Sequence, residues 1–195
     1  TFTVSVTDGE LTDSQSITVT VLPVNDAPVA TTGLSGATAE DQSVVVSLSG
    51  SDIDGDNLSF SLDVDATNGS VTLDGSLATY TPDANYNGDD SFTFSVSDGS
   101  ESSSASVSIS ISAVNDAPVL AAVSDTNFDE DGSGSMSLDG LGSDVDGDDL
   151  TYSITSGSDI TATLNDSDVS FSAPANYNGS ETFTVSVSDG EYSDS

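Results

Sequence analysis

The sequence contains no lysine, arginine, histidine, cysteine or tryptophan. Its 195 residues include 34 aspartates and glutamates, so the formal net charge is −34. Nucleic-acid binding is excluded, because it depends on Lys and Arg side chains that neutralise phosphates. An anionic membrane surface would repel the chain, and no run of about 20 apolar residues could span a bilayer. We therefore expect neither a nucleic-acid partner nor direct membrane insertion.

The missing side chains also exclude most kinds of catalytic site. Without His, Cys or Lys there is no Ser–His or Cys–His nucleophile, Schiff base, P-loop lysine, disulfide or His/Cys zinc site. Paired carboxylates alone could serve a glycosidase. However, the same acids recur along the chain and have no positive or aromatic surroundings for a substrate. We predict that the protein is not an enzyme, and a carbohydrate-binding module is a further alternative.

One unit of about 91 residues is repeated along the chain. Asn25-Asp26-Ala27-Pro28 recurs at 115–118, Asp52-Ile53-Asp54-Gly55-Asp56 at 144–148, and the segment 92–99 at 183–190. Residues 1–14 match residues 182–195 at 11 of 14 positions. A fixed period of this kind indicates tandem domains of one architecture.

Apolar residues alternate with Ser and Thr throughout the repeat, as in Phe92, Phe94 and Val96, and no segment has a helical period. About seven short strands separated by Asn-Gly and Asp-Gly turns predict an antiparallel Greek-key β-sandwich. The predicted fold class is all-β, with tandem sandwiches. We assign 1–23 to the last two strands of a truncated repeat, 24–113 to a complete repeat, and 114–195 to a repeat without its last strand. We therefore expect the sequence to be a window on a longer array.

The acid clusters are the candidate binding sites. Asp52, Asp54 and Asp56 place three carboxylates at alternate positions of a loop, and Asp144, Asp146 and Asp148 repeat the pattern. Such anions favour a hard cation, and Ca²⁺ prefers 6–8 oxygen ligands. The loop is not an EF-hand, because Gly and Glu are missing from its sixth and twelfth positions. The alternative is a solvated acidic turn.

The order of these motifs resembles cadherin repeats. Asn25-Asp26-Ala27-Pro28 is similar to the cadherin linker, and Glu40-Asp41 to the acid of the first strand. Asp52-Ile53-Asp54 is similar to the Asp-x-Asp loop, and Ser97-Asp98-Gly99 to the turn before the last strand. In detail the sequence resembles most the cadherin-like tandem repeats of giant calcium-dependent bacterial surface adhesins, of the RTX and VCBS type.

The resemblance implies Ca²⁺ at each junction between successive repeats. The implied ligands of the first junction are Asn25, Asp26, Asp52, Asp54, Asp56 and Asp98. Those of the second are Glu40, Asn115, Asp116, Asp144, Asp146, Asp148 and Asp189. Asp98 and Asp189 also lie in Asp-Gly sequences that form turns without any ligand.

We therefore predict a non-catalytic, extracellular stalk of a bacterial surface adhesin, with its repeats rigidified by junction calcium. Its partners are the neighbouring repeats of the same long chain. The alternative is a self-assembling filament or sheath at the cell surface, in which repeats pack laterally or exchange strands.

Overall fold

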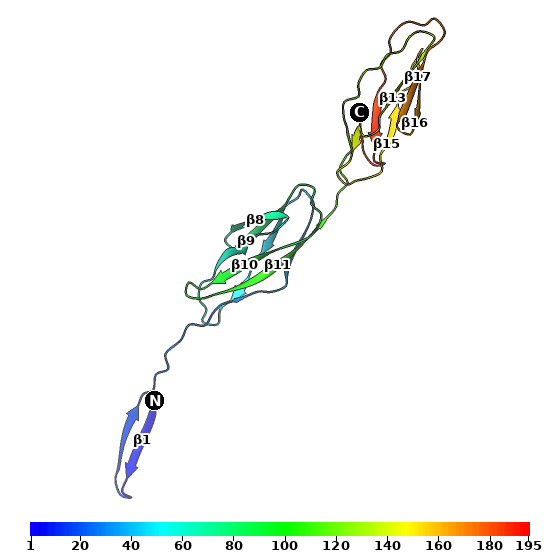
Figure 1. The fold of residues 1–195 in the computed structure, drawn as a ribbon. Coiled ribbons are helices and arrows are strands. Elements are labelled where there is room, and N and C mark those ends of the chain that lie inside the picture. Colours follow the sequence, from blue (N-terminus) through cyan, green and yellow to red (C-terminus); the bar gives the residue numbers. More distant parts are fainter. The chain divides into compact units, whose positions relative to one another are not determined.

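The computed structural model describes all 195 residues, and every regular element in it is a β-strand (Figure 1). None of its elements is a helix long and apolar enough to cross a membrane. The predicted all-β class is confirmed. The chain divides into two compact units, Thr1–Ile111 and Ser112–Ser195.

The first unit contains a complete β-sandwich of two antiparallel sheets. The larger sheet has the order β4 (Leu34–Ala39), β11 (Ser102–Ser112), β10 (Gly88–Ser97), β7 (Ser59–Val64). The smaller has the order β5 (Val44–Ser47), β9 (Leu77–Pro82), β8 (Gly69–Asp74), and β3 (Val29–Ala30) pairs with β6 (Gly50–Ser51). The two main sheets therefore hold seven strands, as the sequence predicts.

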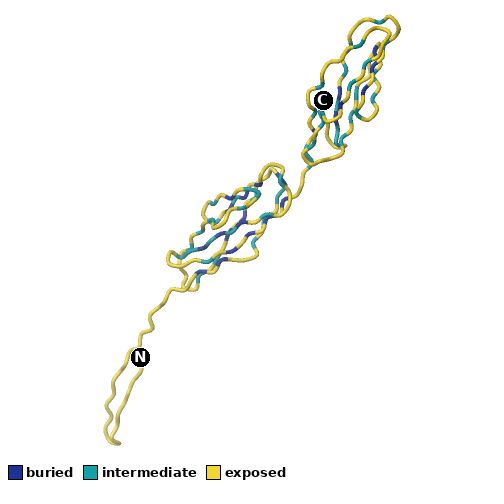
Figure 2. The backbone as a smooth tube through the Cα atoms, in the orientation of Figure 1, coloured by how far each residue is buried: buried dark blue, intermediate teal, exposed yellow.

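The core of this sandwich consists of the inward-facing residues of both sheets. In β11 every second residue from Ala105 to Ile111 is buried, while the serines between them are exposed (Figure 2). This two-residue alternation is the expected pattern for a strand with one buried and one solvated face. The buried apolar core residues are Ala30, Val46, Leu48, Val71, Ala78, Tyr80, Phe92, Phe94, Val96, Ala105, Val107, Ile109 and Ile111.

The first 24 residues form a hairpin and a connecting segment with no core of their own. β1 (Phe2–Thr7) pairs with β2 (Thr12–Ile17), and all of their residues are exposed (Figure 2). Phe2 and Val4 are 66% and 57% exposed, whereas Phe92 and Phe94, which stand at the same positions of the complete repeat, are fully covered. The sequence of the hairpin is therefore that of two core strands.

The second unit repeats the sandwich with a shorter set of strands. Its sheets have the orders β13 (Ser133–Ser137), β17 (Asp168–Ser172), β16 (Thr161–Asn165) and β15 (Thr151–Ile154), β18 (Val185–Ser188), β19 (Ser193–Asp194). β12 (Val119–Leu120) pairs with β14 (Gly142–Ser143). Leu138, Ile160, Val169, Phe171 and Val185 form its buried core. The two-residue β19 stands where the eleven-residue β11 begins in the first unit.

Asp90 supports the interior of the first sandwich. Its carboxylate accepts hydrogen bonds from the backbone N–H of Thr67 (3.2 Å) and Asn68 (2.9 Å) and from the Tyr80 hydroxyl (2.9 Å). Partial burial acts to raise the pKa of Asp90, but these donors and the Ser91 N–H outweigh it and lower the pKa. Burial and the neighbouring Asp90 charge raise the pKa of Tyr80 far above its usual value.

Glu181 takes the equivalent place in the second sandwich. Its carboxylate accepts from the backbone N–H of Ser158 (2.6 Å), Asp159 (3.2 Å) and Ile160 (2.6 Å). Phe171 replaces Tyr80 there, so no hydroxyl needs an acceptor. Neither acid was predicted as a structural residue. A comparison of the two repeats at the 91-residue offset could have identified Asp90 and Glu181 as candidate structural residues, because an acid occurs at the same position of each repeat.

We expect Asp90→Ala to lower the free energy of unfolding of the first sandwich by about 2–3 kcal/mol, because three backbone N–H groups and the hydroxyl of a fully buried tyrosine lose a carboxylate acceptor. The matched control is Asp89→Ala, which removes an exposed neighbouring carboxylate and should change stability by less than about 0.5 kcal/mol. Urea denaturation measures the free energy of unfolding of both variants. Equal effects of the two substitutions would contradict the role assigned to Asp90.

Candidate metal centre

Two short strands bring the linker motif next to the acid loop in each unit. Ala27 and Pro28 separate Asp26 from the start of β3, and β6 ends immediately before Asp52. The two strands pair with Val29 opposite Ser51. Pro28 is fully buried and anchors the linker against the sandwich. Residues that are far apart in sequence are therefore held at one end of the domain.

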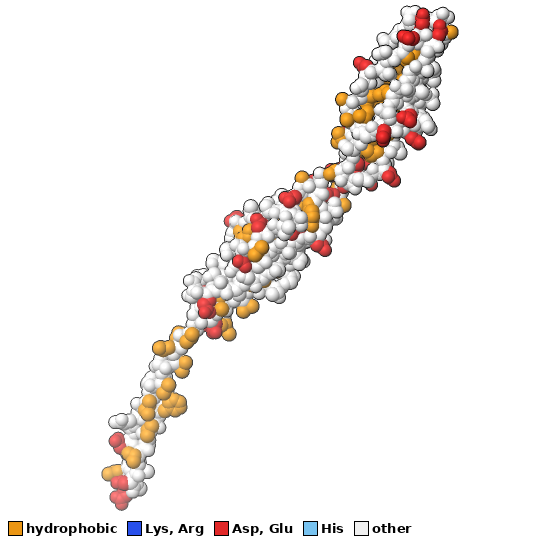
Figure 3. Space-filling view, viewed as in Figure 1, with side chains coloured by type: hydrophobic (Ala, Val, Ile, Leu, Met, Phe, Trp, Pro, Cys, Tyr) orange, Lys and Arg blue, Asp and Glu red, His pale blue; other side chains and the backbone are white.

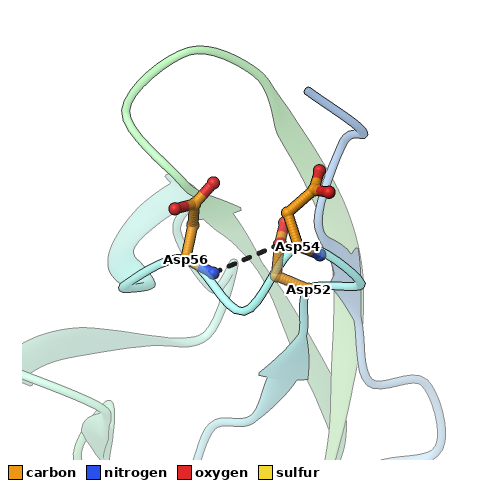
Figure 4. A group of neighbouring side chains, drawn as sticks. All are labelled: Asp52, Asp54 and Asp56. Atoms are coloured by element: carbon orange, nitrogen blue, oxygen red, sulfur yellow. Dashed lines mark hydrogen bonds between the residues drawn. The ribbon is translucent and has the colours of Figure 1, made fainter. Parts of the chain in front are cut away.

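The acid loop is organised around one oxygen of Asp52. Asp52 Oδ1 accepts hydrogen bonds from the backbone N–H of Asp54 (2.8 Å), Gly55 (3.1 Å) and Asp56 (3.4 Å). Gly55 has a φ of 81°, a conformation that glycine adopts without strain. Carboxylate oxygens of Asp52, Asp54 and Asp56 lie within 4.8 Å of one another. Figure 4 shows the Asp54 and Asp56 carboxylates on the same side of this loop.

Two further hydrogen bonds connect the linker to this end of the sandwich. Asp26 donates its backbone N–H to Asp54 Oδ2 at 2.8 Å. The Asn25 side-chain amide donates to Asp98 Oδ2 at 2.9 Å. Asp98 Oδ1 in turn accepts from the backbone N–H groups of its own turn, between β10 and β11. All six residues predicted for the first site thus lie close together at one end of the first sandwich.

The second unit reproduces this arrangement almost atom for atom. Asn115 donates to Asp189 Oδ2 at 2.8 Å, and the Asp116 N–H donates to Asp146 Oδ2 at 2.8 Å. Asp144 Oδ1 accepts from the N–H groups of residues 146–148 at 2.9, 3.1 and 3.4 Å. Carboxylate oxygens of Asp144, Asp146 and Asp148 also lie within 4.8 Å of one another. The same cluster therefore forms twice, independently.

The second oxygen of the leading aspartate is unsatisfied in both loops. Asp52 Oδ2 and Asp144 Oδ2 are buried and have no hydrogen-bond partner. Leaving a buried carboxylate oxygen unpaired is costly, and the chain has no Lys, Arg or His side chain that could pair with it. A hard divalent cation among the three carboxylates would satisfy this oxygen. The donor set, all oxygen, fits calcium rather than a metal that prefers nitrogen or sulfur.

Hydrogen bonds and charge repulsion act on the pKa values in opposite directions. Backbone donation from Glu101 and the Asn25 amide lower the pKa of Asp98. Burial acts to raise the pKa of Asp189, but the Asn115 amide and the N–H groups of its turn outweigh it and lower the pKa. Burial, together with the charges of Asp144 and Asp146, raises the pKa of Asp148. The anionic form of Asp148 is therefore disfavoured by burial and by the charges of its own cluster.

Glu40 is the one predicted ligand that the first unit places elsewhere. It is only 3% exposed and lies at the end of β4, where Asn87 contacts its Oε2 at 3.5 Å. Asn87 precedes β10 and Asp98 follows it, so the ten residues of β10 separate them by roughly 30 Å. Glu40 does not belong to the Asp52 cluster. Its assignment to the second junction remains a prediction.

The sequence matches one known domain family over most of its length. A family model described as bacterial Ig domain matches residues 25–110 and again residues 115–195. The chain belongs to the bacterial Ig domain family. A comparison with curated proteins gives no match.

Solved structures of low sequence identity resemble this chain, and among those named here the fold is shared with the cadherin domains of protocadherin gamma B7. Extracellular cadherin domains 1–4 of protocadherin gamma B7 are 15% identical, with a TM-score of 0.50 over 83% of this chain and 45% of that one. Human protocadherin-24 EC1-2 is 16% identical, with a TM-score of 0.46 over 84% and 86%. An endo-fucoidan hydrolase of glycoside hydrolase family 107 is 24% identical, with a TM-score of 0.40 over 97% and 32%, so the Ig domain chain spans about a third of it. At these identities the likeness concerns the fold alone.

We expect Asn115→Ala, measured in EGTA, to move the pKa of Asp189 upward toward its ordinary value of 3.8, because the amide that favours the anion is lost. A group with a lowered pKa in the folded state contributes stability above its unfolded pKa and loses it as pH falls through the folded pKa. The variant should therefore lose less stability on acidification below about pH 4. Carboxyl ¹³C NMR titration of Asp189 measures the shift. An unchanged titration curve would contradict the role of Asn115.

Proposed function

We propose that this chain is a non-catalytic, extracellular structural segment whose bacterial Ig domains each bind Ca²⁺ at the end that carries the linker motif. One observation carries the proposal. Asp52 Oδ2 and Asp144 Oδ2 are buried without a partner at equivalent positions of two acidic loops. Repetition of the same orphaned oxygen in both repeats favours a site over a solvated turn.

The residues that would hold the ion come from three segments of each domain. In the first domain they are the acid loop 52–56, the linker residues Asn25 and Asp26, and Asp98 of the last turn. Their carboxylate and amide oxygens provide the hard ligands that Ca²⁺ prefers. The bound ion would reduce the repulsion among the carboxylates and fix the linker against the sandwich.

Holding the linker in one position would stiffen the tandem array. The linker joins successive domains of a tandem array. Three residues separate Asn25 from Val21 and Asn115 from Ile111, which are the last positions of the alternating apolar series. With calcium bound, the short linker would be held to the domain that follows. Without calcium, the acidic domain ends would repel and the linker would act as a hinge.

For the whole protein we propose a bacterial surface adhesin of the calcium-dependent repeat type, in which these domains form the stalk. Proposed ligands of the second site are Asn115, Asp116, Asp144, Asp146, Asp148 and Asp189, with Glu40 as a further ligand at that junction. The chain contributes reach and stiffness, and its high negative charge keeps the array soluble. The adhesive element would lie in another part of the protein.

We expect isothermal titration with CaCl₂ to show binding that Asp52→Asn abolishes in the first domain and Asp144→Asn in the second. Each substitution keeps an Oδ1 acceptor for the loop and removes the charge that the ion requires. Ligand binding stabilises the folded state by about 2.7 kcal/mol at a concentration 100 times Kd, which raises Tm by on the order of 10 °C for a domain of this size.

Asp63→Asn is the matched control, because it removes one charge from an exposed aspartate of β7 outside the cluster. It should retain the full binding enthalpy and the calcium-dependent rise of Tm. Magnesium, which demands octahedral geometry and keeps its water, should give a much smaller rise. A Tm that is indifferent to calcium, or an equal loss in all three variants, would overturn the proposal.

A further inference from the structure

The two acid loops have the same backbone geometry but carry different charge. The leading aspartate accepts from three consecutive N–H groups at 2.8, 3.1 and 3.4 Å in the first loop and at 2.9, 3.1 and 3.4 Å in the second. The φ values of Gly55 and Gly147 are 81° and 80°. However, Asn57 directly follows the first loop, whereas Asp149 directly follows the second. The second loop is therefore followed by one more negative charge.

Asp149 lies close enough for its charge to act on the second cluster without being part of it. Its side chain is exposed, and it is not one of the three carboxylates whose oxygens lie within 4.8 Å of one another. Burial raises the pKa of Asp148, and the charge of Asp149 is among the neighbouring charges that raise it further. The electrostatic field of Asp149 thus reaches the carboxylates that would hold the ion.

No cationic side chain neutralises this additional charge. The chain contains no Lys, Arg or His, and the charged side chains on the visible face in Figure 3 are all acidic. In calcium sites made of oxygen ligands, the affinity is tuned by the charge count and by the rigidity of the site. Because the hydrogen-bond distances of the two loops are nearly the same, we expect charge to be the term that separates their affinities.

We propose that the residue directly after each acid loop sets the calcium affinity of that domain, and that Asp149 strengthens binding through its field rather than as a ligand. This inference rests on the proposed calcium function. A divalent ion and a unit charge about 8 Å apart in water attract strongly enough to change an equilibrium constant about fivefold. An asparagine such as Asn57 offers no such attraction.

Repeats of one array would then load calcium at different concentrations. The bound fraction of a site depends on the ratio of the free ion concentration to Kd. A domain with aspartate after the loop would hold its linker at a calcium concentration about fivefold lower than a domain with asparagine at the same position. A fall in calcium would therefore release the linkers in steps, and the array would lose its stiffness gradually.

Reciprocal substitution tests the proposal, because further residues also differ between the two linker ends. The Asp52→Asn chain reports the second site alone, and in this chain we expect Asp149→Asn to raise the Kd for calcium about fivefold. The Asp144→Asn chain reports the first site alone, and there Asn57→Asp should lower the Kd by about the same factor. Isothermal titration with CaCl₂ measures all four values.

Salt gives a readout that the loss of a ligand would not give. The Debye length is about 30 Å in 0.01 M KCl and about 3 Å in 1 M KCl. Both effects should therefore be present in the lower salt and fall below about twofold in the higher salt. The matched control is Asp129→Asn in the Asp52→Asn chain. It removes one charge from an exposed aspartate that β13 separates from the acid loop, so the Kd should be unchanged.

The possible results separate this inference from the proposed function. Calcium binding that neither reciprocal substitution alters would overturn the role of Asp149 and leave the proposed function intact. An effect of the same size in the higher salt would also overturn it, because Asp149 would then act as a ligand. Absence of calcium binding in both parent chains would overturn the proposed function itself, and this inference with it.

Discussion

The folded chain has to accommodate 34 carboxylates without a single cationic side chain. Most of these side chains are exposed to solvent, and backbone N–H groups pair with several of them. Asp8, Asp98 and Asp189 each accept two N–H groups of their own turn. Asp90 and Glu181 each cap a loop in the same way. These five acids are thus used as turn-forming groups within an anionic sequence.

Backbone donors satisfy only Oδ1 of Asp52 and Asp144, and the second oxygen of each is buried without a partner, unlike Oδ2 of Asp98 and Asp189, which accepts from an asparagine amide. Three carboxylates meet in each acid loop, one buried oxygen remains unpaired, and Asp148 has a raised pKa because of burial and its neighbours. The proposed calcium ion would supply positive charge at the linker end of each domain, where the structure holds none.

Much of the fold and of the two acid clusters could be predicted from the sequence, because strand periodicity and the 91-residue repeat can be read directly from the order of the residues. The two-residue alternation located β10 and β11, and the recurring Asn25-Asp26 and Asp52-Ile53-Asp54 motifs identified two clusters that the structure does assemble. The shortened β18 could not be predicted, since its sequence is nearly that of β10. The alternating pattern indicates which residues can form a strand but not how many of them pair, because pairing is a tertiary interaction. Asp90 and Glu181 were missed for a similar reason, because their partners lie about 20 residues away.

The most direct measurement is a crystal structure grown in calcium chloride, with data collected at a wavelength where calcium scatters anomalously. The calcium proposal predicts an anomalous peak at both acid loops, within about 2.3–2.6 Å of Asp52 Oδ2 in the first domain and of Asp144 Oδ2 in the second. Water molecules bonded to these two oxygens, with no anomalous peak at either loop, would contradict it and would identify the clusters as solvated turns.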